Sequence, residues 1–211
     1  MRSFVAVNVP QQVKNHIRHV QEDLQGKGVK AKWINPDNCH FTLLFLGDQP
    51  ESALEKIKQI LKDEYSKTDA VKLEYSQVNT FKKSPRVLFA EYESLSVPTF
   101  GDLVQTTCNA SEKADIDLPD GAIKKQAIPH LTIARFKKKQ NAKTLCNIAD
   151  WEDGKWHWRH EMPPPPENAE QIAVREVTLF QSILRNNGAE YIPLESFSLK
   201  LTKTKGLNNY G

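Results

Sequence analysis

Hydrophobic and polar residues along the chain follow two periods, one typical of strands and one typical of helices. The run RSFVAVNV near the N-terminus alternates and predicts a strand that ends at Pro10. Apolar residues then recur at helical spacing between residues 13 and 24 and predict a helix, which ends at the GKG of residues 26–28. The run VKAKWI predicts a second strand, closed by the turn Asn35-Pro36-Asp37-Asn38.

The pattern continues through the rest of the chain. It predicts strands at 39–46, 71–81, 86–92 and 128–136, a helix after Pro50, a helix from Pro98 to about Ala114, a polar loop at 115–126, a short helix at 137–150, and a closing antiparallel pair at 171–184 and 190–201 around Asn186-Asn187-Gly188. Short turns join several of these strands, which favours an α+β fold over a doubly wound parallel sheet.

Residues 150–169 break this pattern, because they hold three of the four tryptophans and four consecutive prolines. A polyproline segment is extended and stiff. One interpretation is a surface extension whose tryptophans pack back on the body. The other is a substrate-side flap, in which Trp156, Trp158 and Arg159 stack on bases. His157 and His160 are candidate metal ligands by residue type only, and their spacing does not indicate a metal site.

Two strands carry the same short phrase, NCHFTLLFLGD and PHLTIARF. With six histidines in the chain, roughly 0.3 H-x-T triplets are expected by chance, against the two observed. Side chains alternate along a strand, so the histidine and threonine of each triplet share a face, and the residue between them points into a core. The candidate site residues are His40, Thr42, His130 and Thr132.

If the two strands lie side by side, two imidazoles face one reacting centre. At neutral pH one imidazole can be the general base and the other the general acid. The two hydroxyls can donate hydrogen bonds to oxygens that gain charge. In-line displacement at phosphorus suits this layout, and a strained cyclic phosphate would be a fitting substrate. The chemistry requires no metal ion and no other cofactor.

Two less specific interpretations stay open for these residues. Each histidine could be a satisfied, half-buried residue of a strand. A cysteine nucleophile is a competing idea, but Cys39 precedes His40 directly, and adjacent strand residues point to opposite faces.

Composition adds limits rather than a function. The net charge of +3 and the pI near 8.6 permit a nucleic-acid partner without requiring one. The three cysteines are an odd number without a C-x-x-C pair, which argues against a disulfide framework or a zinc knuckle. No segment approaches the roughly 18 apolar residues that cross a bilayer, and the N-terminus lacks a signal-peptide pattern. We therefore expect a cytoplasmic protein without a membrane partner.

The paired H-x-T strands resemble those of the 2H phosphoesterases, and among them the RNA 2′,3′-cyclic phosphodiesterases, formerly called 2′-5′ RNA ligases. The resemblance extends over most of the chain through RSFVAVNVP, KWINPDNCHFTLLFLGD, SPRVLFAEY, IPHLTIARF and VTLFQSILRNNGAEYIPLESFSL. It implies one α+β domain over residues 1–211, with two pseudo-symmetric lobes that line a central cleft. The loop 115–126 and the insertion at about 150–169 depart from the compact family members.

By this resemblance His40 and His130 are the catalytic histidines, and Thr42 and Thr132 hold the phosphate. Arg135 matches an arginine associated with the phosphate, but strand alternation places it opposite His130 unless the strand bulges. Basic residues could form a rim for an RNA backbone, namely Lys32, Lys82, Lys83, Arg86 and Lys137–Lys139, although exposed lysines are usually only solvated.

The resemblance implies an enzyme that opens RNA-terminal 2′,3′-cyclic phosphates to 2′-phosphates. It also implies a reversible 2′-5′ ligation, in which a 5′-hydroxyl takes the place of water. Its expected partner is RNA with such ends, and we expect a monomer. One alternative is a non-catalytic module that binds RNA ends. Another is a phosphodiesterase that acts on cyclic nucleotides or 2′-5′ oligoadenylate. The two phrases are nearly equivalent, so the sequence does not tell which histidine is the base.

Overall fold

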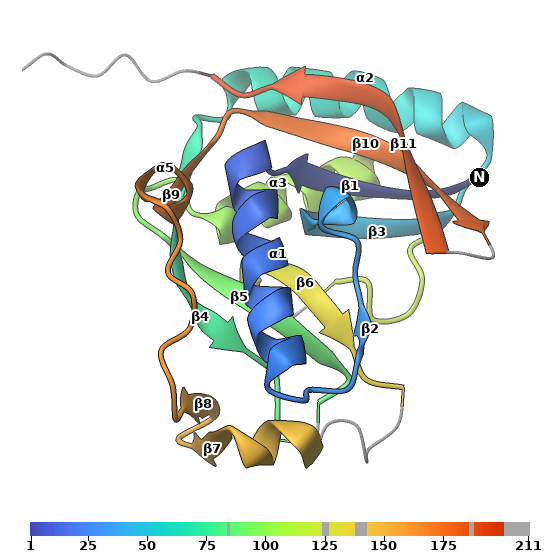
Figure 1. Ribbon diagram of the computed structural model, residues 1–211. Helices are drawn as coiled ribbons and strands as arrows, with labels where there is room; N and C mark the ends of the chain where they lie inside the picture. The colour runs from blue at the N-terminus through green and yellow to red at the C-terminus, as the bar shows by residue number, and fades with distance from the viewer. Residues whose placement is uncertain (84, 124–126, 138–142, 186–187, 201–211) are drawn as a thin grey trace, which may run out of the picture.

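The computed structural model describes residues 1–83, 85–123, 127–137, 143–185 and 188–200 (Figure 1). In this part of the chain nine strands form one antiparallel sheet in the order β11-β10-β1-β3-β6-β5-β4-β9, with β2 paired to β6. The strands are β1 (Arg2–Asn8), β2 (Lys32–Trp33), β3 (His40–Asp48), β4 (Val71–Asn79), β5 (Val87–Ser94), β6 (His130–Arg135), β9 (Gln171–Val174), β10 (Glu176–Arg185) and β11 (Gly188–Ser198).

The sheet curls until its two ends approach each other. β9 and β10 are separated only by Arg175, yet β9 is the last strand of the order at one end and β10 is next to the last strand at the other end. A backbone hydrogen bond of 2.8 Å from Leu199 to Arg175 and a bridge between Asp69 and Lys200 hold this junction. The single strand predicted at 171–184 is therefore wrong. Its first part pairs with β4 and its second part with β1, because the chain crosses from one sheet end to the other.

The helices exchange sides between the two halves of the sheet. They are α1 (Gln11–Gly26), α2 (Glu51–Lys67), α3 (Phe100–Lys113) and the short α5 (Glu167–Glu170), with one-turn 3₁₀ segments η1 (Pro36–Asn38) and η2 (Lys143–Asn147). α1 follows β1 but lies across β4, β5 and β6 (Figure 1). α3 follows β5 but packs against β3 and against α2. This exchange gives the two halves the pseudo-symmetry that the family resemblance implies.

Side chains explain why these helices form and where they pack. Thr99 and Asp102 form a capping box that begins α3. The apolar side of α1 faces the sheet. From the same helix, the side-chain amide of Gln21 donates hydrogen bonds of 2.7 and 3.0 Å to the backbone carbonyls of Ile34 and Ile133. The helix thereby satisfies buried carbonyls at the junction of β2 and β6.

The Trp- and Pro-rich segment contains a hairpin that the sequence reading missed. Its strands are β7 (Ala149–Glu152) and β8 (Lys155–Trp158), joined by the turn Asp153-Gly154, where both residues have positive φ. An Asp-Gly pair is a common sequence signal of such a turn. The short helix predicted at 137–150 is also partly wrong. Residues 138–142 lie outside the described residues, 143–147 form η2, and β7 begins at Ala149.

Among the described residues no helix is both long enough and apolar enough to span a bilayer.

Candidate active site

β3 and β6 are neighbours at the centre of the sheet, and they are joined at the pair Phe41–Leu131. Both of these side chains are fully buried. The residue before and the residue after each of them therefore point to the opposite face of the sheet. The structure thus brings four half-buried polar side chains together on one face, and these are His40, Thr42, His130 and Thr132.

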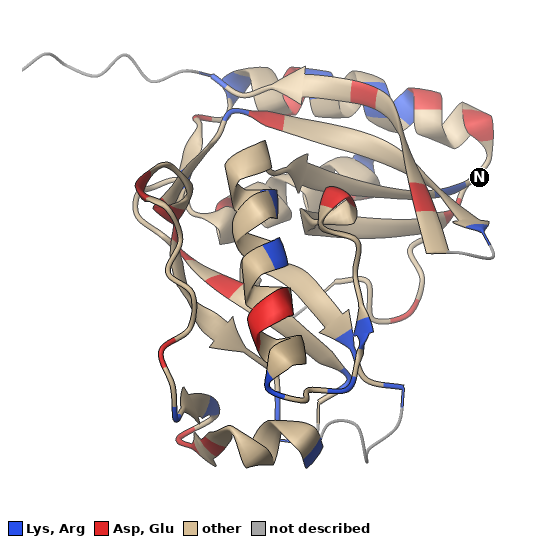
Figure 2. Ribbon diagram, in the orientation of Figure 1, with Lys and Arg blue, Asp and Glu red and all other residues tan. Residues whose placement is uncertain are grey.

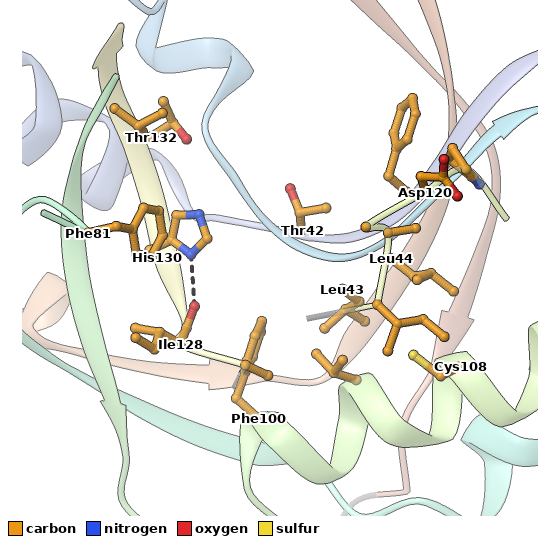
Figure 3. Close-up of a pocket in the computed structure, with 18 of the residues that line it drawn as sticks. Thr42, Leu43, Leu44, Phe81, Phe100, Cys108, Asp120, Ile128, His130 and Thr132 are labelled. Carbon is orange, nitrogen blue, oxygen red and sulfur yellow. Dashed lines mark hydrogen bonds between the residues drawn. The ribbon is translucent and has the colours of Figure 1, made fainter. Parts of the chain in front are cut away.

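The two histidines are anchored in the same way. In each, Nδ1 lies 2.8 Å from the backbone carbonyl two residues earlier, that of Asn38 for His40 and that of Ile128 for His130. A carbonyl oxygen can only accept, so Nδ1 carries the proton and donates it. The chemistry of each ring then belongs to Nε2, which is a lone-pair acceptor when the imidazole is neutral. In Figure 3 this nitrogen of His130 points toward the space beside Thr42 and Thr132.

Aromatic rings flank each imidazole, again in a matched arrangement. The ring centroids are 4.9 Å apart for His40–Phe4, 5.2 Å for His40–Tyr191, 5.1 Å for His130–Phe81 and 5.2 Å for His130–Phe89. Phe4 lies on β1, the neighbour of β3, and Phe89 lies on β5, the neighbour of β6. A hydrogen bond and aromatic contacts thus hold each ring and fix its orientation.

A bulge in β6 brings Arg135 to the cleft. Thr132 is opposite Phe89, and Ala134 is opposite Leu88, so Ile133 is the extra residue. The extra residue reverses the alternation beyond it and turns Arg135 to the face of Thr132. This is the condition under which the sequence allowed Arg135 to reach the site.

β3 contains a bulge at the equivalent place. Thr42 is opposite Ala6, and Leu44 is opposite Val5, so Leu43 is extra. Phe45 therefore occupies on β3 the position that Arg135 occupies on β6. The repeated phrase thus extends beyond H-x-T to a shared bulge and a side chain that re-enters the cleft.

Two adjoining hollows open onto these residues. One has a volume of about 420 Å³ and is lined by His130 and Thr132, by residues of α3 and by the 119–123 part of the loop (Figure 3). The other has a volume of about 290 Å³ and is lined by His40. They share three lining residues, which are Thr42, Phe45 and Arg135. A ligand seated over these shared residues would have one histidine on each side.

Comparisons with known proteins agree with this geometry. A family model described as LigT like Phosphoesterase matches residues 7–89. The RNA 2′,3′-cyclic phosphodiesterase of Methanocaldococcus jannaschii is 31% identical over 195 residues, which cover 90% of this chain and 96% of that protein. The chain belongs to the LigT-like family of 2H phosphoesterases.

Further relatives support the same membership and the fold. The enzyme of the same name from Methanothermobacter thermautotrophicus is 26% identical over 204 residues, covering 94% of this chain and 99% of that one. The structure of TT0787 of Thermus thermophilus has a TM-score of 0.69 at 23% identity and covers 94% of this chain and 98% of its own. Apo LigT of E. coli has a TM-score of 0.66 at 19% identity, with 96% and 98% covered. The predicted family, enzyme class and α+β fold are confirmed.

Burial, and to a lesser extent charge, favours the neutral ring of His40 in this phosphoesterase. Burial lowers the pKa of His40, the hydrogen bond to the Asn38 carbonyl opposes that shift, and the positive charge of Arg135 adds to the lowering. A second guanidinium, that of Arg2, lies 4.8 Å from the centre of the Phe45 ring and lines the hollow of His40. The site therefore presents positive charge where an anionic group would enter.

Cys39 is placed as a core residue. It is buried, its thiol lies 3.6 Å from the carbonyl of Thr132, and burial raises its pKa to about 12. A thiol with that pKa is not a thiolate at neutral pH, so it is a poor nucleophile.

The proposed basic rim is partly outside the described residues. Lys82, Lys83 and Arg86 are exposed, and so is Lys137, whereas Lys138 and Lys139 are not described. Lys32 of β2 is in register with Arg135, and Figure 2 shows basic residues on β2 and at the end of β6. The rim stays a prediction.

The Trp- and Pro-rich segment does not present its tryptophans for stacking on a base. Trp156 is 2% exposed and packs edge-on against Trp151, and Trp158 is half-buried. Arg159 makes a two-pronged ion pair with Asp150. This agrees with the interpretation of an extension that packs on the body. In the described part of the chain, no three His, Cys, Asp or Glu side chains gather in a way that could hold a metal ion.

Sequence reasoning missed the residues that surround the histidines. Phe4 and Tyr191 belong to strands far from His40 in the chain, and Phe81 follows the end of β4. A comparison of the two phrases at longer offsets would have shown Phe45 and Arg135 as a matched pair. The aromatic flanks gave no local signal, because they depend on strand order.

Proposed function

We propose that this phosphoesterase hydrolyses RNA-terminal 2′,3′-cyclic phosphates to 2′-phosphomonoesters by acid–base catalysis with His40 and His130. The observation that carries the proposal is the matched pair of anchored imidazoles, with two hydroxyls, on adjacent strands. The relatives named RNA 2′,3′-cyclic phosphodiesterase support the substrate class. LigT of E. coli has been crystallised with 3′-AMP and with phosphate, which supports a nucleotide phosphate as ligand.

The reaction requires one base and one acid on opposite sides of phosphorus. Water gives a proton to Nε2 of one histidine as its oxygen bonds to phosphorus. The bond from phosphorus to the 3′ oxygen breaks, and Nε2–H of the other histidine protonates that oxygen. We infer that His40 is the base, because burial and Arg135 favour its neutral form, and that His130 is the acid.

The threonines and Arg135 stabilise the charge that develops during this displacement. Thr42 and Thr132 are each next to a histidine on the same strand face, so their hydroxyls would donate to the non-bridging oxygens. Arg135 would neutralise part of the phosphate charge from the space that both hollows share. These two imidazoles supply both proton transfers, so the proposed reaction needs no metal ion.

The test uses an oligonucleotide that ends in a 2′,3′-cyclic phosphate, with excess chelator present. We expect turnover by the native protein and a loss of about 10² to 10⁴-fold in kcat for His40→Ala and for His130→Ala. His157→Ala is the matched control, because His157 is exposed on the hairpin, away from the two hollows. Full activity of either active-site variant would contradict the proposal.

The same assay separates the alternatives. An RNA-end binding module would bind the oligonucleotide without turnover. An enzyme for cyclic nucleotides or 2′-5′ oligoadenylate would prefer those compounds over a longer cyclic-ended RNA. Incubation of the 2′,3′-cyclic-ended RNA with a 5′-hydroxyl RNA tests 2′-5′ ligation, in which the 5′ oxygen attacks phosphorus in place of water and the bond from phosphorus to the 3′ oxygen breaks. The proposed RNA substrate fits a cytoplasmic enzyme, and size-exclusion chromatography with light scattering tests the expected monomer.

A further inference from the structure

The β7–β8 hairpin is attached to the end of β4 through its tryptophans. Nε1 of the buried Trp156 donates a 2.8 Å hydrogen bond to Oγ1 of Thr80, the first residue after β4. Nε1 of Trp158 donates a 3.0 Å hydrogen bond to the carbonyl of Val78, within β4. The two indoles thus bind the C-terminal end of β4 at two nearby positions, Val78 and Thr80.

Thr80 is the centre of a small buried network. It is 2% exposed, its backbone N–H donates to Oδ1 of Asn79 at 2.8 Å, and its hydroxyl donates to the carbonyl of Lys82 at 2.9 Å. Asn79 in turn donates to Oε2 of Glu91 on β5 at 2.9 Å. Because the Thr80 hydroxyl already donates to a carbonyl, the indole N–H fills its acceptor side. The turn that follows β4 is therefore fixed from two directions.

The next residue in this turn is Phe81, which is part of the wall of the cleft. Its ring lies 5.1 Å from the ring of His130, edge-on, and 4.4 Å from the ring of Phe89. It lines the larger hollow, and its overall exposure is 51%. A half-exposed aromatic side chain is not fixed by burial alone. The position of the Phe81 ring therefore also depends on the backbone of the turn after β4.

We propose that Trp156 is a positioning residue for this active site: through Thr80 it fixes Phe81 against His130. The insertion thereby supports the orientation of the imidazole from outside the cleft. The ring of His130 has a hydrogen bond on Nδ1 and aromatic contacts on its sides, so a shift of Phe81 would redirect Nε2. A small change in the orientation of Nε2 lowers the rate of proton transfer more than it weakens substrate binding. The activity readout rests on the proposed function.

The first test is Trp156→Phe, which removes the indole N–H and keeps an aromatic ring in the core. We expect kcat on a cyclic-ended oligonucleotide to fall about 10-fold with KM changed less than about twofold, as for an effect on the transition state. Trp158→Phe is the matched control, since it removes an indole N–H from the same hairpin without touching Thr80. It should leave kcat unchanged.

A second pair of variants keeps the test decisive if the core substitution prevents folding. Thr80→Val loses the acceptor for Trp156 and also the donor to the Lys82 carbonyl, so it should lower kcat at least as much as Trp156→Phe does. Thr80→Ser keeps the hydroxyl and should keep the native kcat. In a Phe81→Ala background, Trp156→Phe should have no additional effect, because both act through one ring. Additive losses would overturn the proposal.

An NMR measurement separates this proposal from the proposed function. The Phe81 ring current shifts the ring C–H signals of His130, so Trp156→Phe should move those signals and leave those of His40 in place. If the native protein shows no turnover but the His130 signals move, the proposed function fails and the positioning role stands. If turnover is normal and neither kcat nor the His130 signals change in Trp156→Phe, the positioning role is wrong.

Discussion

Arg135 of β6 acts on His40 of β3, so the second H-x-T strand sets the charge around the histidine of the first. Burial lowers the pKa of the His40 imidazole most, and the positive charge of the Arg135 guanidinium, which lines the same hollow, adds to the lowering. The bulge at Ile133 turns Arg135 to the face of the sheet on which His40 lies. A side chain of β6 therefore affects the protonation of a histidine on β3.

Replacement of Arg135 should change the pH dependence of catalysis. In Arg135→Met the positive charge disappears, so protonated His40 is less disfavoured and its pKa rises toward 6.5. If His40 is the base, activity is lost below its pKa, and the acidic limb of kcat/KM moves to higher pH. Profiles of kcat/KM from pH 5 to 8 measure this. Arg135→Lys keeps the charge and should keep the limb near its native position. An acidic limb that stays fixed in Arg135→Met would contradict the assignment of His40.

The two threonine hydroxyls should contribute separately to kcat. Thr42→Val and Thr132→Val keep the shape of the side chain and remove one donor each, and loss of one such donor typically costs about 10² to 10³-fold in kcat. Serine at either position retains the donor and should recover most of the rate. Thr106→Val, on the surface of α3, is the control for a lost hydroxyl. Steady-state kinetics that show native kcat for both valine variants would exclude this role.

The core of the site could be predicted because its signal is local. Alternation along a strand puts His40 and Thr42 on one face whatever the neighbouring strand is. The face of Arg135 could not be predicted, since a bulge depends on pairing with β5 and leaves no clear mark in the sequence. The contact between Tyr191 and His40 could not be predicted either. It depends on the order of the four strands β11, β10, β1 and β3, which only the folded sheet defines.

The error at 171–184 has a similar cause. The apolar pattern continues on both sides of Arg175, and no glycine or proline interrupts it, so the pattern predicts one long strand. Alternation tells that a segment is extended but not which strand it pairs with. The curl of the sheet divides the segment between two partners.

Activity should not depend on Cys39. The thiol is buried and burial raises its pKa to about 12, so we expect a thiol-alkylating reagent to leave Cys39 unmodified in the folded protein. Cys39→Ala should lower the free energy of unfolding by about 1 kcal/mol, because it removes a buried group from the core, with kcat unchanged. Urea unfolding and kinetics on the same sample measure both. A large loss of kcat in a folded Cys39→Ala variant would instead support a mechanism in which the Cys39 thiol is the nucleophile.

Stability should fall in mild acid because of His16. This residue of α1 is buried, its Nε2 donates to the carbonyl of Pro163 at 2.9 Å, and burial lowers its pKa. Below about pH 6.5 the unfolded chain binds a proton at this residue that the folded protein does not, so the free energy of unfolding decreases as pH falls. In His16→Gln the amide can still donate to Pro163 but cannot titrate. Urea midpoints measured from pH 8 to pH 5 should therefore fall less in the variant than in the native protein, and equal slopes would show that His16 does not couple folding to pH.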